Sequence, residues 1–135
     1  MRHVLSCLAM AALSALFTTP VSAEDRMLSH SVYFSLTDNS DAAKDALIAA
    51  CKKYLSDHPG TVWFAAGKLA PEFAREVNDR DFDVALLLVF KDKAAHDRYQ
   101  SADKHQQFIA QCKGNWKKVR VFDAYVEAAP APACK

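Results

Sequence analysis

The alternation of apolar and polar residues along the chain predicts four β-strands. In residues 30–36 every second side chain is apolar, and this period of two is typical of a strand with one buried face. Residues 82–90 are apolar at nearly every position, which is typical of a strand that is covered on both faces. The expected strands span residues 30–36, 61–69, 82–90 and 119–126.

Between these strands, apolar residues recur at helical spacing. Residues 41–56 place one apolar stripe on a helix, which ends at Asp57-His58-Pro59-Gly60 because proline cannot continue it. After the third strand, Asp92 is expected to cap a helix over residues 93–99, and Ser101 a further one over residues 102–113. The stretch from residue 70 to 81 is polar and irregular.

The predicted order of elements, β-α-β-β-α-β, indicates an α+β protein with a ferredoxin-like fold. In this arrangement a four-stranded antiparallel sheet carries its helices on one face. The third strand is apolar on both sides, so a monomer would expose half of it to water. Because large exposed apolar patches mark interfaces, we expect a homodimer whose sheets pack face to face, with Leu87 or Leu88 at the interface.

The N-terminus has the three parts of a secretory signal peptide. A basic start with Arg2 precedes an apolar run of about 14 residues and a small-residue ending at Ala23. Cleavage there would leave a domain over residues 24–126 and an Ala/Pro-rich tail over residues 127–135. We therefore expect an exported protein, located in the periplasm or outside the cell, with no later segment able to anchor it in a membrane.

Charge argues against nucleic acid as a partner. Arg2 is the only charged residue of the signal, so the rest of the chain keeps 16 of the 17 basic residues against 16 acidic ones. A balanced surface gives no electrostatic reason to bind nucleic acid or an anionic membrane.

The three cysteines that follow the signal are an odd number in an oxidising compartment, which predicts one disulfide and one free thiol. Cys51 and Cys112 lie on helices expected on the same face of the sheet, so they can pair. Their bond would close a loop of about 60 residues and contribute about 4 kcal/mol. Pairing of Cys112 with Cys134 is the alternative.

The histidines do not predict a metal site. The four that follow the signal show no His-x-His or His-x-x-x-His spacing, and no cofactor motif such as Cys-x-x-Cys-His occurs. His58, in a turn, and His96, on a helix, are expected at the surface. His30 is in phase with the apolar face of the first strand, so it can face a pocket on the helix side.

Several features together resemble the stress-responsive dimeric α/β-barrel (Dabb) family, from His30 to Val126. They are His30, Pro59-Gly60, Gly67, Phe82-Asp83, Tyr99 followed six residues later by His105, Phe108, and Val121-Phe122-Asp123. The resemblance implies a ferredoxin-like dimer in which two sheets close a barrel. It departs from the family at Ala102-Asp103, where many members carry His-Pro.

The family includes polyketide cyclases, and this resemblance implies a catalytic role for two residues. His105 would act as general base, the Tyr99 hydroxyl would hold a substrate carbonyl, and His30 would support them. Residues six apart on an unbroken helix lie about 120° from each other, so the pair requires a helix break near residues 101–102. A purely structural Tyr99–His105 hydrogen bond is the alternative explanation.

We therefore expect a homodimer that holds a small apolar or aromatic molecule in a pocket between helices and sheet. The expected pocket residues are Val32, Phe34, Trp63 and Phe108, although Trp63 and Phe64 point to opposite faces and only one of them can contribute. A proton-transfer enzyme of the cyclase or lyase type is the alternative.

Overall fold

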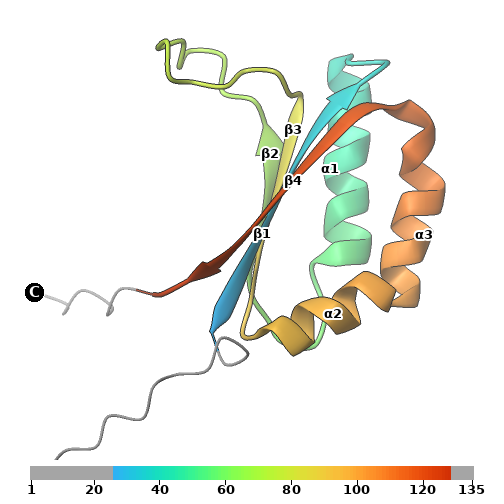
Figure 1. The fold of residues 1–135 in the computed structure, drawn as a ribbon. Helices are drawn as coiled ribbons and strands as arrows, with labels where there is room; N and C mark the ends of the chain where they lie inside the picture. The colour runs from blue at the N-terminus through green and yellow to red at the C-terminus, as the bar shows by residue number, and fades with distance from the viewer. Residues whose placement is uncertain (1–25, 129–135) are drawn as a thin grey trace, which may run out of the picture.

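The computed structural model describes residues 26–128, in which the helices all lie on one face of a single antiparallel sheet (Figure 1). The expected signal peptide and the chain from residue 129 onward lie outside the described residues. The strands are β1 (Met27–Leu36), β2 (Thr61–Lys68), β3 (Val84–Phe90) and β4 (Trp116–Val126), and their order in the sheet is β2-β3-β1-β4. The predicted ferredoxin-like fold is confirmed, with β1 and β4 each three residues longer at the start than expected.

Helix α1 (Asp41–Leu55) and helix α2 (Lys93–Ser101) begin at side-chain caps. Ser40 accepts a hydrogen bond from the backbone N–H of Ala43, and Asp92 accepts one from that of Ala95 at 2.7 Å. Each cap satisfies an N–H group that the first turn of a helix leaves free. Helix α3 (Asp103–Cys112) follows and runs into the 3₁₀ turn η2 (Lys113–Asn115).

A single residue, Ala102, breaks the second helical region into α2 and α3. Its ψ of 142° is extended rather than helical, and its N–H closes the end of α2 on the carbonyl of Tyr99 at 3.1 Å. The break falls where it was expected, but Ser101 does not cap α3. Its hydroxyl donates back to the carbonyls of Asp97 and Arg98, because Ser101 is the last residue of α2.

The core lies between the sheet and the helices. Alternate residues of β1 and β3 are buried there, and Leu88 is only 1% exposed. Phe34 packs edge to face against Phe108 of α3, and Leu47 and Leu55 approach from α1. This continuous apolar layer fixes where α2 and α3 lie over β1.

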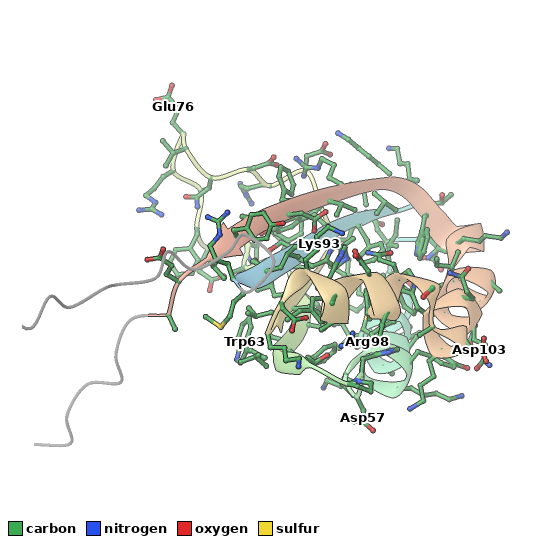
Figure 2. The ribbon with its side chains drawn as sticks, turned by 60° about the horizontal axis from the view of Figure 1, so that its bottom comes forward. Asp57, Trp63, Glu76, Lys93, Arg98 and Asp103 are labelled. Carbon is green, nitrogen blue, oxygen red and sulfur yellow. The ribbon has the colours of Figure 1, made fainter. Side chains whose placement is uncertain are left out.

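The opposite face of the sheet carries large apolar side chains. Trp63 of β2 is 52% exposed and Phe122 of β4 is 55% exposed. Leu87 of β3, which pairs with Ala65 of β2 and Ser31 of β1, lies on the same face. The loop between β2 and β3 projects on this side, and Glu76 stands at its far end (Figures 1 and 2). Arg120 of β4 holds the loop by an ion pair with Asp79, which lowers the pKa of that carboxyl to about 2.

The expected Cys51–Cys112 disulfide is not formed; both residues are free thiols. The helices that carry them, α1 and α3, do pack together, but a disulfide also requires particular Cβ separations and directions, which neighbouring helices do not guarantee. Cys51 is fully buried, and burial, with a smaller contribution from Cys112, raises its pKa to about 12. It therefore behaves as a small apolar core residue. Cys134 lies outside the described residues.

Candidate functional site

A cavity of about 230 Å³ lies between the sheet and the helices α2 and α3. We call it the Tyr99–His105 cavity. Its walls are mostly apolar and its polar groups are few: it is lined by His30, Val32, Phe34, Leu86, Tyr99, Gln100, His105, Phe108, Ile109, Trp116, Val119, Val121 and Asp123.

The cavity borders the edge strand β4. Val119 and Val121 lie on the helix side of this strand, opposite Phe34 and Val32 of β1, yet they remain 38% and 50% exposed. Their partners in β1 are buried beneath the helices. The helices thus cover β1 but not β4, and the uncovered edge gives solvent, or a ligand, access to the cavity.

Tyr99 and His105 come together because of the break at Ala102. Their rings lie 4.6 Å apart, centroid to centroid, at 45°. The expected Tyr–His hydrogen bond is not found, and the Tyr99 hydroxyl has no hydrogen-bond partner within residues 26–128. Burial raises the pKa of Tyr99, so its hydroxyl stays protonated and can donate to a ligand in the cavity.

His105 presents an accepting nitrogen. Its Nδ1 lies 3.0 Å from the backbone carbonyl of Gln100, and since a carbonyl only accepts, Nδ1 carries the proton of the neutral ring. Nε2 is then left with its lone pair. Burial is the main cause that lowers the pKa of His105 below its usual value, which favours this neutral form.

His30 is buried and hydrogen-bonds Asp123 directly across the β1–β4 pair. The distance from Nδ1 to Oδ1 is 2.6 Å, and the two residues are partners in the strand register. Burial lowers the pKa of His30, although the Asp123 carboxylate acts in the opposite direction. Asp123 was expected only as part of the Val121-Phe122-Asp123 match in the last strand, without a role at the site. Its phase with Val119 and Val121 places its carboxylate on the helix side of β4.

The expected pocket residues divide between the two faces of the sheet. Val32, Phe34 and Phe108 line the cavity together with Tyr99, His105 and His30. Trp63 does not, because alternate residues of a strand face opposite sides and Trp63 lies on the far face. Its neighbour Phe64 packs against the helix-side core instead.

Two histidines expected at the surface are not there. His58 is 8% exposed, because the turn at Gly60 folds it back so that its Nε2 meets the carbonyl of Tyr54 at 2.9 Å. The side chain of His96 is 14% exposed and packs against His30, with ring centroids 5.1 Å apart. His30, His96 and Asp123 form a cluster of possible metal ligands whose donor atoms all lie within 4.8 Å of one another.

A larger hollow of about 560 Å³ lies on the opposite face, against the β2–β3 loop. Tyr33, Phe82 and Phe122 line it, and Arg120 contributes a positive charge to its wall. It contains no histidine or cysteine, so it offers less acid–base chemistry than the smaller cavity.

Among the described residues, no helix is both long and apolar enough to cross a membrane.

Comparison with solved structures shows the same fold in distant proteins. A Dabb family protein with a ferredoxin-like fold from Mesorhizobium loti is 24% identical, with a TM-score of 0.63 over 77% of this chain and 99% of its own. A dimeric ferredoxin-like protein of unknown function from Thermobifida fusca is 14% identical, with a TM-score of 0.64 over 79% of this chain and 97% of its own.

The hydroxynitrile lyase from Passiflora edulis is 17% identical, with a TM-score of 0.62 over 78% of this chain and 97% of its own. Curated protein sequences contain no match to this chain. The profile of the Stress responsive A/B Barrel Domain matches residues 28–126, which is most of the chain. The chain therefore belongs to the Dabb family, as its sequence features suggested.

Proposed function

We propose that the protein is an exported homodimer that holds a small apolar or aromatic molecule in the Tyr99–His105 cavity. The observation that carries this proposal is the composition of the cavity: apolar walls with a few polar groups that converge on one space, which is typical of small-molecule sites. A volume of about 230 Å³ suits a single-ring compound, since an apolar cavity of about 150 Å³ can hold benzene.

The outer face of the sheet supports the homodimer. Trp63, Leu87 and Phe122 make this face apolar, and an apolar patch over several strands is typical of an interface. The relative from Thermobifida fusca is described as dimeric. In the proposed dimer two such faces pack together, and the helix-side cavity of each protomer stays outside the interface.

Export rests on the N-terminal sequence alone. The basic start, the apolar run and the ending at Ala23 favour cleavage and delivery to the periplasm or beyond.

The second candidate function is proton transfer on the bound molecule, favoured by the two unoccupied polar atoms of the site. The Nε2 lone pair of His105 can accept a proton from carbon, while the Tyr99 hydroxyl donates to the carbonyl oxygen that becomes negative. The likeness to a hydroxynitrile lyase, an enzyme on the same fold, is consistent with chemistry at such a site.

Thermal-shift measurements with single-ring phenols and aromatic ketones test the binding proposal. One compound class is expected to raise the melting temperature of the wild type and not that of Tyr99→Phe or His105→Gln. Tyr54→Phe is the matched control, because Tyr54 lies on α1 outside the cavity lining and should leave the ligand response intact. Equal responses in all four proteins would place the ligand elsewhere and contradict the proposal.

A further inference from the structure

The His30–Asp123 hydrogen bond has a third neighbour that the proposed ligand site does not use. His96 projects from the first turn of α2, and Asp123 reaches both the Tyr99–His105 cavity and a separate hollow of about 280 Å³ beside His96. Three elements that are far apart in the sequence, β1, α2 and β4, thus each contribute one side chain to the same point.

We propose that His30, His96 and Asp123 bind one divalent transition-metal ion of the zinc type. Their donor atoms lie within 4.8 Å of one another. Around a tetrahedral zinc ion with bonds of about 2.0–2.2 Å, donor atoms lie about 3.3–3.6 Å apart. The cluster therefore needs only small side-chain movements to close around an ion.

The backbone already holds the three residues in place. His30 and Asp123 are direct partners in the β1–β4 register, so their Cα positions are fixed by the sheet. His96 follows the Asp92 cap of α2, which orders the first turn of that helix. Asp123 supplies the adjustable ligand, because its side chain is 47% exposed whereas that of His30 is 5% exposed.

The donor set selects the class of metal. Two imidazole nitrogens and one carboxylate suit zinc and the neighbouring first-row divalent ions, whereas magnesium and calcium prefer oxygen ligands alone. Three protein ligands leave a fourth position, and the hollow lined by His96 and Asp123 gives it room for water or another small ligand.

Groups around the cluster also fit a bound cation. Gln100 Nε2 lies 3.0 Å from Nε2 of His96, and the Asp97 carboxylate lies 3.5 Å from its Nδ1. An ion bound at Nε2 would replace Gln100, and the N–H at Nδ1 would then point to the Asp97 carboxylate, which orients the ring. Lys93 lines the same hollow and would repel a cation, but its ammonium is paired with Asp97 at 2.5 Å. The positive charge that lines this hollow is therefore offset by a neighbouring carboxylate.

Calorimetric titration of the untagged protein with Zn²⁺ tests the site, with Co²⁺ absorption as a report on the ligands. One ion per chain is expected to bind, and His96→Ala and Asp123→Asn are each expected to weaken binding by ~100-fold or more. These two positions are partly exposed, so the variants should fold, which circular dichroism checks. Buried His30 is left unchanged.

Two control variants separate this site from its surroundings. Asp103→Asn removes an exposed carboxylate that is not in the cluster and lies on another helix, α3, and His105→Gln removes the proposed ligand-site histidine. Both should keep the wild-type zinc affinity. Because His105→Gln abolishes the proposed small-molecule binding but not zinc binding, failure of one proposal is distinguishable from failure of the other.

Three outcomes would overturn the metal site. They are the absence of zinc binding at millimolar concentration, equal affinity in the wild type and His96→Ala, and a cobalt spectrum with a thiolate charge-transfer band. The last would assign the ion to cysteines, which all the variants retain.

Discussion

Gly60 and Ala95 lie so close together that a methyl group on Gly60 would stand 2.5 Å from the Cβ of Ala95. Gly60 also has a φ of 91°, which side-chain-bearing residues rarely adopt. The turn that ends α1 and starts β2 thus packs directly against the buried face of α2, on the same helix that carries Tyr99 and His96.

Gly60→Ala is expected to destabilise the protein by about 3 kcal/mol, because a strained φ and a steric clash each cost about 1–2 kcal/mol. Urea unfolding measures the change. Gly114→Ala is the matched control, since a Cβ at Gly114 would meet nothing within 4 Å, and its effect should stay within about 0.5 kcal/mol. Equal losses in the two variants would mean that the contact with Ala95 is unimportant.

His105→Gln is expected to slow proton exchange at the carbon next to the carbonyl of a bound aromatic ketone by ~10²–10⁴-fold. The reason is that Gln cannot accept a proton as the Nε2 atom of His105 can. Deuterium incorporation followed by NMR gives the rate. His58→Gln is a useful comparison, because His58 is also buried but does not line the cavity. No exchange above that of the free ketone would leave binding as the only function of the site.

Stability should fall as the pH drops below about 6.5, the usual pKa of histidine. Burial lowers the folded-state pKa of both His30 and His105, so the unfolded chain binds their protons at higher pH than the folded protein does. The stabilisation is therefore complete above the unfolded-state pKa and is lost as the pH falls through the folded-state values.

Urea unfolding at pH 7.5 and pH 5.5 checks this expectation, and His105→Gln should show a smaller difference between the two conditions than the wild type. Carboxyl groups such as that of Asp79, with a pKa of about 2, titrate well below this window and do not contribute. An identical pH dependence in the variant would contradict the assignment to His105.

Leu87→Lys is expected to halve the mass measured by sizing with light scattering, because it puts a charge on the apolar outer face. Leu88→Lys should instead prevent folding, since Leu88 is 1% exposed in the core and burying an unpaired charge costs more than about 4 kcal/mol. Gln107→Lys adds the same charge on exposed α3 and should leave the mass unchanged. A dimer that persists in Leu87→Lys would exclude this face as the interface.

The fold was predictable because its strands have simple patterns. The alternation through Val32 and Phe34 and the doubly apolar run at Leu86 to Leu88 each define a strand without any tertiary information. The first residues of β1 and β4 were missed, since pairing between the two strands extends them beyond the point where the pattern begins.

The site was predictable only in part. The break near Ser101 was expected from the pattern of two capped helices, but the role of Ala102 depends on backbone angles that the sequence does not state. His96 and Asp123 join His30 from other elements, so no local spacing could reveal the cluster. His58 was misplaced because its burial results from a turn that only glycine permits.

Asp123 has one carboxylate and two surroundings, the Tyr99–His105 cavity and the hollow beside His96. A change of charge or hydrogen bonding in one space alters the charge and the hydrogen bonds that the carboxylate presents to the other. If both proposed sites bind, their occupancies are linked through Asp123 and the linkage is reciprocal: a cation beside His96 would change ligand affinity by the same factor as the ligand changes affinity for the cation. One strand residue would then be enough to couple a metal ion to a small-molecule site.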